Sequence, residues 1–271
     1  MPSGKSSKAV RNSRSVVTAT KPKPWGTIVA VLAVLIFAGG IFGYLYLRYE
    51  DSAAFIPTAE NQDPSTQIDG IQKVEYGPKN RGHVVSPRRV AYDHSPPFGG
   101  PHDEFWATCD GQVYEQAVRN ENMIHSLEHG AVWIAYNPEQ ITGTALDSLR
   151  KRVEGQFYIM LSPYPGLDSP ISLQSWGHQL KVTDAEDERI DQFIRSLRAN
   201  QYTHPEVGSP CDVLPGKFDP TNPPLFVAEP PGPDAMPMDS SSENGSAPVG
   251  GAEPAGPGGD VPAPPEPSPE G

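Results

Sequence analysis

The stretch HSLEH holds two histidines and a glutamate in five positions, at His125, Glu128 and His129. On a helix, side chains three and four positions apart project from one face, so the two imidazoles can share a metal ion. Glu128 could complete the coordination, orient a ligand or act as a base. The order H-x-x-E-H is also that of the inverted zinc metalloproteases, so a metal-dependent hydrolase is one hypothesis for this motif.

Three more histidines precede the motif, at positions 83, 94 and 102, and a stretch rich in proline and glycine separates the last two. Such a stretch predicts a rigid, sharply turned loop that can hold side chains over the end of a helix. Loop and helix together could supply three or four nitrogen ligands, which suit zinc or copper better than calcium or magnesium. The alternative is a hydrogen-bonded polar patch that anchors the loop and binds no metal. The predicted ligands are His125, His129, His102 and His83, with Glu128 contacting a ligand rather than the ion.

The elements that must position these histidines follow from the pattern of apolar residues. Residues 113–129 predict a helix with Gly130 just past its end, where a left-handed backbone is needed. Further helices are expected over 138–154 and 183–200. Helices and strands without strict alternation indicate one compact α+β domain. Strands are expected over 131–136, 156–162 and 170–182, which are rich in branched and aromatic residues.

Charge divides the chain into three parts. The first 25 residues hold six basic and no acidic residues, whereas residues 48–271 hold 33 acidic and 15 basic ones. Residues 26–47 carry no charge and, at about 1.5 Å per residue, are long enough to cross a membrane as one helix. The basic head favours a cytoplasmic N-terminus, so a single-pass cell-membrane protein with an extracytoplasmic C-terminal part is expected. The acidic surface of residues 48–271 would repel phosphate backbones, which argues against nucleic acid as a partner.

Composition sets the remaining boundaries. Residues 48–70 are polar and are expected to form a linker, followed by the domain over 71–218. Residues 219–271 are acidic and rich in proline and glycine, which predicts a disordered tail. This tail, or a glycine face of the apolar helix, could contact other subunits of a membrane complex. The glycines of that face are Gly39, Gly40 and Gly43.

Cys109 and Cys211 are the only cysteines, and both fall in the part expected outside the cytoplasm. In an oxidising compartment such a pair predicts a disulfide. Closing a loop of about 100 residues would stabilise the fold by about 4 kcal/mol in the chain-entropy model. The alternative is that the two cysteines are thiolate metal ligands. Their wide separation in the sequence does not favour this alternative.

Three segments near the histidines, PPFGGPH, HSLEHGAVWIAYNP and ISLQSWGHQL, resemble the bacterial, mainly actinobacterial, domain-of-unknown-function family 3105. The resemblance covers about His83 to Leu197. It implies an N-terminal membrane anchor and an exported domain, and it brings no established activity. The pair Phe98-Gly99 departs from the threonine–serine pair that is more usual in the family. The resemblance places the family's motif residues on His102, His125, Glu128, His129 and Gly130, and it extends to His83.

The leading hypothesis is a membrane-anchored extracytoplasmic protein that binds zinc or copper. It would handle metal or support a membrane complex such as a respiratory one, as a binding protein rather than an enzyme. A structural or assembly subunit with no metal is the alternative. The H-x-x-E-H hydrolase, in which Glu128 would be essential, is the second alternative.

Overall fold

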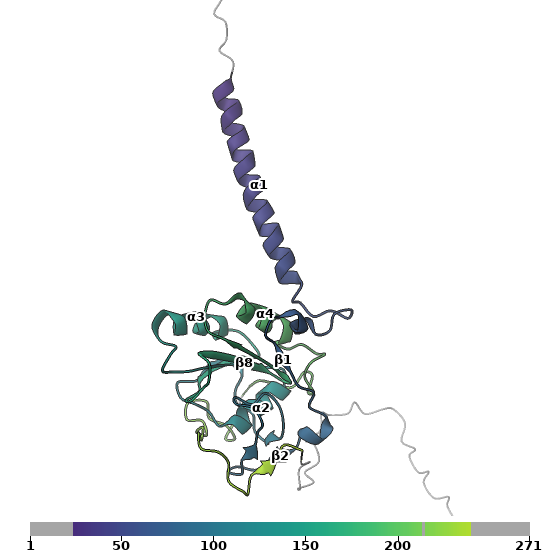
Figure 1. Cartoon of the computed structure of the whole chain (residues 1–271), viewed down its shortest axis with the longest axis vertical. Helices are drawn as coiled ribbons and strands as arrows, with labels where there is room; N and C mark the ends of the chain where they lie inside the picture. The colour runs from purple at the N-terminus through teal and green to yellow at the C-terminus, as the bar shows by residue number, and fades with distance from the viewer. Residues whose placement is uncertain (1–23, 213–214, 240–271) are drawn as a thin grey trace, which may run out of the picture. The chain divides into compact units, whose positions relative to one another are not determined.

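The computed structural model describes residues 24–212 and 215–239, which form two units that meet at Ala53 and Ala54 in the sequence. The first unit contains helix α1, Trp25–Ala53 (Figure 1). Its segment Trp25–Tyr46 has a mean hydropathy of 2.6 and is long and apolar enough to cross a membrane, a property that signal sequences share. This helix contains the predicted span. Its orientation stays a prediction, because most of the basic head, residues 1–23, lies outside the described part of the chain.

The second unit is built on a six-stranded mixed sheet. Its strands are β1 Gln72–Lys73, β5 Asp110–Val113, β6 Val132–Tyr136, β7 Ile159–Pro163, β8 Ile171–Ser175 and β9 His178–Val182. The order is β1-β9-β8-β6-β7-β5. β7 runs parallel to both of its neighbours, β5 and β6, and the other three pairs are antiparallel. The mixture of helices with this sheet confirms the predicted α+β class.

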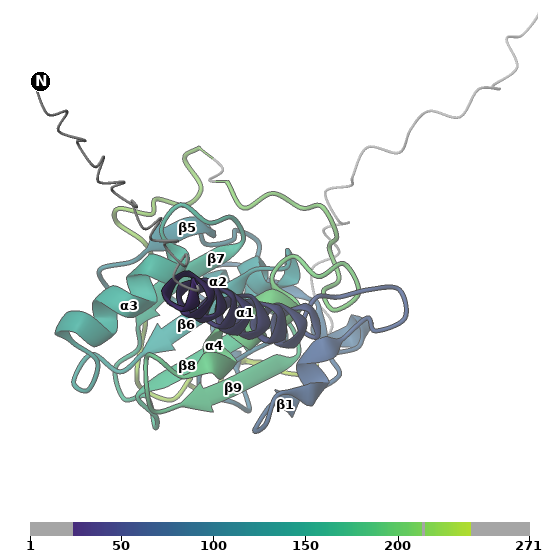
Figure 2. The same cartoon turned by 90° about the horizontal axis from the view of Figure 1, so that it is seen from above.

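Helices α3, Gly143–Val153, and α4, Glu188–Leu197, cover one face of the sheet (Figure 2). In α4 the apolar residues Ile190, Phe193 and Leu197 recur every three or four positions and are fully buried. This spacing puts them on one side of the helix, against the strands. They pack there with strand residues such as Ile134, Leu161 and Leu173.

The opposite face of the sheet packs against helix α2, Asn120–Glu128, which carries most of the histidine motif (Figure 1). Side chains of β6 alternate between the two faces, as a strand requires. Ile134 therefore faces α3 and α4, whereas Trp133 and Ala135 join the second apolar cluster with Ile124 and Leu127 of α2.

Two short parallel ladders complete the domain. β2, His83–Val84, pairs with β4, His102–Asp103, and β3, Val90–Ala91, pairs with β10, Met236–Pro237. Single turns of 3₁₀-helix occur as η1, Pro64–Gln67, and η2, Pro78–Asn80.

The observed helices are shorter than predicted. The helix expected over 113–129 begins at residue 120, because residue 113 still belongs to β5 and Val118 forms a bridge with Leu225. The helices over 138–154 and 183–200 are present, and both begin about five residues later than expected.

The strand predicted over 170–182 is two strands, β8 and β9, which form an antiparallel hairpin. The turn between them contains Gly177, which has a φ of +72°. A Cβ atom there would lie 2.7 Å from the carbonyl oxygen of Val74. Glycine therefore permits both the left-handed backbone and the close approach of the neighbouring chain.

The folded unit extends past both predicted ends of the domain. Ile68, in the predicted linker, is buried in the cluster beneath α4. Beyond residue 218, Phe226 packs against Tyr164, and Met236 is buried where β10 pairs with β3. These apolar residues anchor a segment that its average composition had predicted to be a disordered tail. The rest of that predicted tail, residues 240–271, lies outside the described part of the chain.

Cys109 and Cys211 form a disulfide, with their Cα atoms 4.9 Å apart. The amide of Cys109 also donates a hydrogen bond to the carbonyl of Cys211, at 3.2 Å. The disulfide holds residues 204–212 against the part of the domain that contains α2. This segment is called the strap below.

Candidate metal centre

Three short elements bring the predicted histidines together. The parallel pairing of β2 with β4 sets His83 opposite His102. His125 and Glu128 lie three positions apart on α2, so they project from the same face of the helix. These four residues, called the inner group, each offer a ligand atom, and those atoms all lie within 4.8 Å of one another.

The geometry of the inner group fits a single ion. The ring centroids are 4.9 Å apart for His83 and His102, 4.7 Å for His102 and His125, and 5.2 Å for His83 and His125. Oε2 of Glu128 lies 2.8 Å from Nε2 of His102. In a tetrahedral zinc site with ligands at about 2.0–2.1 Å, neighbouring ligand atoms are roughly 3.3 Å apart. The ligand atoms of the inner group, which lie within 4.8 Å of one another, would have to approach by up to about 1.5 Å to reach that arrangement.

Backbone hydrogen bonds orient two of these rings. Nδ1 of His102 donates to the carbonyl of Gly100 at 2.9 Å, and Nδ1 of His125 donates to the carbonyl of Asp103 at 2.7 Å. Because a carbonyl only accepts, Nδ1 carries the hydrogen, and Nε2 of the neutral ring carries a lone pair. Histidines that bind metals commonly have this second hydrogen bond, which fixes the ring and the tautomer.

Two buried nitrogens of the inner group lack a hydrogen-bond partner among the described residues: Nε2 of His83 and Nε2 of His102. When its ring is protonated, His102 instead forms an ion pair with Glu128, with 2.8 Å between Nε2 and Oε2. A buried polar atom left unsatisfied costs about 1–3 kcal/mol. A metal ion between these nitrogens would satisfy both.

Burial controls the charge of the inner group. It lowers the pKa of His125 well below its ordinary value, and the neighbouring histidines lower it further. It also lowers the pKa of His83. Burial acts in the same direction on His102, but the charge and close contact of Glu128, the hydrogen bond to the carbonyl of Gly100 and the charge of Glu206 together outweigh it, so the pKa of His102 is raised. At neutral pH, His83 and His125 are therefore uncharged, the state in which imidazole binds a metal.

His129 lies beside the inner group rather than within it. It is the C-cap residue of α2, and its Nδ1 donates to the carbonyl of Pro210 in the strap at 2.7 Å. Its Nε2 lies 3.3 Å from Oε2 of Glu206. His125, His129 and Glu206 form a second set of ligand atoms within 4.8 Å of one another.

These positions differ from the predicted ligand set in two respects. Glu128 offers a ligand atom in the inner group, where the prediction had His129. The helix ends at the motif, so His129 turns toward the strap while Glu128 stays beside His125. Glu206 was not predicted, because the chain brings it to the motif only through tertiary folding.

The start of α2 is fixed to the segment that carries His102. The guanidinium of Arg119 pairs with the carboxylate of Asp103, whose carbonyl accepts the hydrogen bond from His125. The hydroxyl of Ser126 donates to the carbonyl of Ala107 at 2.6 Å. Two side-chain contacts thus hold the helix to the loop beside the inner group.

The end of α2 depends on Gly130, as predicted. Its φ is +98°, and a Cβ atom there would lie 2.7 Å from the ring of His204. Nδ1 of His204 donates to the carbonyl of Glu128 at 3.1 Å. Only glycine lets the strap approach the helix end this closely.

The other histidines lie outside both groups. His94 contacts Asp93 and Gln72 on the surface. Nε2 of the buried His178 lies 3.1 Å from Oδ2 of Asp63, which also accepts a hydrogen bond from Lys73 at 2.9 Å. Sequence reasoning missed this last cluster, because Asp63 fell in the predicted linker.

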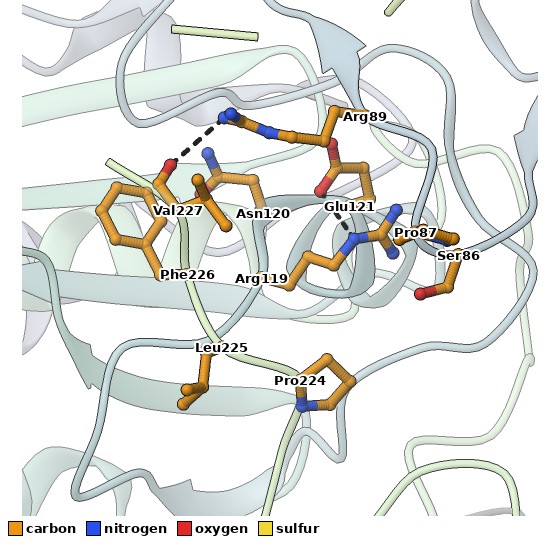
Figure 3. Close-up of a pocket in the computed structure, with 10 residues that line it drawn as sticks. All are labelled: Ser86, Pro87, Arg89, Arg119, Asn120, Glu121, Pro224, Leu225, Phe226 and Val227. Atoms are coloured by element: carbon orange, nitrogen blue, oxygen red, sulfur yellow. Dashed lines mark hydrogen bonds and ion pairs between the residues drawn. The ribbon is translucent and has the colours of Figure 1, made fainter. Parts of the chain in front are cut away.

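A pocket of about 220 Å³ lies near the start of α2 (Figure 3). No residue of the inner group, nor His129 or Glu206, lines it. Its basic side chains are engaged: Nε of Arg119 lies 3.2 Å from Glu121, and Arg89 donates to the carbonyl of Val227 at 3.1 Å. The pocket lacks the ligands of a metal site, so the inner group is the stronger candidate.

Comparison with known proteins identifies the domain but not its activity. Residues 83–213 match the sequence model of the family described as protein of unknown function (DUF3105), and this domain belongs to that family. The matched stretch contains both groups of side chains that could hold a metal ion. Comparisons with curated proteins and with solved structures gave no match.

Proposed function

We propose that this protein binds one zinc or copper ion in an extracytoplasmic domain that α1 anchors to the cell membrane. His83, His102, His125 and Glu128 are the ligands. The proposal rests on one observation: two buried imidazole nitrogens without hydrogen-bond partners lie within ligand distance of a buried carboxylate. Its role is metal handling or support of a membrane complex, rather than catalysis.

The ligand types favour a borderline transition metal. Three imidazoles and one carboxylate suit zinc or copper, whereas calcium takes six to eight oxygen ligands. Four protein ligands would fill a tetrahedral coordination sphere, as in structural zinc sites. An H-x-x-E-H hydrolase needs an open coordination position and Glu128 as a base, so a ligand role for Glu128 favours binding over hydrolysis.

Two further features support a membrane anchor and an extracytoplasmic domain. The apolar segment Trp25–Tyr46 has the length and composition of a membrane span, and basic residues precede it. The disulfide between Cys109 and Cys211 fits an oxidising compartment. A cytoplasmic N-terminus and an exported domain account for both features.

Titration of the metal-stripped full chain in detergent with Zn²⁺, and separately with Cu²⁺, tests the proposal. We expect one ion to bind per chain and expect no binding in the His102→Asn/His125→Asn variant. His94→Asn is the matched control, since His94 lies outside both groups, and it should bind like the wild type. Absence of binding by the wild type would leave the metal-free assembly subunit, whose histidines serve only to hold loop and helix together.

A further inference from the structure

His129 and Glu206 form a pair directly beside the proposed centre. His125 connects the two groups: its ring centroid lies 4.7 Å from that of His102 and 4.7 Å from that of His129. The ring of Trp106 packs against both His125 and His129, with centroid distances of 5.5 Å and 4.7 Å. The space between the groups is therefore short and enclosed by rings.

Glu206 is the most exposed residue of the two groups. The side chain of His102 is 0% exposed and that of His129 is 2% exposed, whereas that of Glu206 is 42% exposed. His83 is half-buried, but its Nε2 atom is buried like that of His102, so an ion in solution can meet the exposed carboxylate of Glu206 before it meets either nitrogen. A negative charge at the surface raises the local concentration of cations.

The strap fixes Glu206 in this position. The amide of Glu206 donates to the carbonyl of Glu128 at 3.1 Å, so the two glutamates are joined through the backbone at the helix end. The hydroxyl of Tyr158 donates to the carbonyl of Ser209 at 2.8 Å. These bonds, with the disulfide, preorganise the carboxylate over His129.

His125 can serve only one ion at a time. Its Nδ1 is engaged by the carbonyl of Asp103, so Nε2 is its one free ligand atom. We infer that His129 and Glu206 form an outer station through which a transition-metal ion reaches and leaves the inner group, with His125 shared between the two positions. This inference rests on the proposed function, because it requires an inner site that holds the ion.

An outer station has a distinctive kinetic effect. At equilibrium the ion occupies the inner group, so the station changes the rates of uptake and release by the same factor and leaves the dissociation constant unchanged. Stoichiometry stays at one ion per chain, because both positions need His125. A merely structural role for Glu206 predicts a different result: loosening the strap would expose the inner group and speed release.

The test measures exchange of Zn²⁺ on the full chain in detergent, by release to a chelator and by uptake of isotopically labelled zinc. Glu206→Gln retains the shape of the side chain and removes its charge, and His129→Gln removes the second ligand of the station. Glu115→Gln is the matched control, since the exposed Glu115 pairs with Arg150 outside both groups. We expect both station variants to bind one equivalent with the wild-type affinity and to exchange it at least about tenfold more slowly.

Three results would overturn the inference. Exchange in Glu206→Gln at the wild-type rate or faster would assign Glu206 a structural role alone. Loss of the ion in Glu206→Gln would make it a ligand of the resting site. Absence of zinc binding by the wild type would refute the proposed function itself, and the titration distinguishes that result from the other two.

Discussion

Replacing Glu128 with glutamine should weaken metal-dependent stabilisation of the domain. The amide keeps the size of the side chain but removes the negative charge 2.8 Å from His102. Loss of a side chain that only orients a metal ligand typically lowers metal affinity about 10–100-fold, which we take as the smallest effect expected when a ligand is lost. At a zinc concentration of 100 times the wild-type dissociation constant, binding stabilises the wild type by about 2.7 kcal/mol. For a domain of this size, that stabilisation raises Tm by about 5–11 °C.

The same zinc concentration is only one to ten times the dissociation constant of the variant. The stabilisation then falls to about 0.4–1.4 kcal/mol. The corresponding rise in Tm is about 1–6 °C. Near-ultraviolet circular dichroism of the full chain in detergent, with and without Zn²⁺, measures both shifts. Glu115→Gln should respond like the wild type, and a Glu128→Gln variant with the full wild-type shift would refute Glu128 as a ligand.

Three other changes should alter stability, each measured by denaturant unfolding. Gly130→Ala places a Cβ atom 2.7 Å from His204 at a left-handed φ, and we expect a loss of about 1–3 kcal/mol. Burial raises the pKa of Asp63, but hydrogen bonds from a histidine, a serine and a lysine outweigh it and lower the pKa. Asp63→Asn should therefore be less stable than the wild type at pH 7, by a difference that shrinks as the pH falls below about 4; a difference independent of pH would contradict this. Replacing Cys109 and Cys211 with alanine should lower the free energy of unfolding by about 4–5 kcal/mol. An unchanged denaturant midpoint would refute a stabilising role for the disulfide.

The elements best predicted from the sequence are those with strong local patterns. β6 follows directly from a run of branched and aromatic residues, and α4 follows from Ile190, Phe193 and Leu197 on one face. The predicted ligands include three of the four inner-group residues, and the fourth, Glu128, was expected beside a ligand, for a similar reason. His125 and Glu128 are close on any helix, and the rigid loop limits where His102 can lie.

What the sequence could not predict depends on contacts between distant segments. β2 has two residues, and its position is set by pairing with β4 rather than by its own composition. Glu206 meets His129 only because the disulfide and Gly130 let the strap cross the end of α2. The helix expected from residue 113 starts later because Val113 belongs to a parallel strand, and that pairing overrides the helical pattern.

The metal content of the native protein tests the central claim most directly. The full chain, expressed without a histidine tag and purified without chelators, is measured by elemental mass spectrometry beside the His102→Asn/His125→Asn variant. We predict about one equivalent of zinc or copper in the wild type and none in the variant, with the fold of both retained. A wild type that holds no metal even after reconstitution, or a variant that keeps the full equivalent, would contradict the assignment of the inner group.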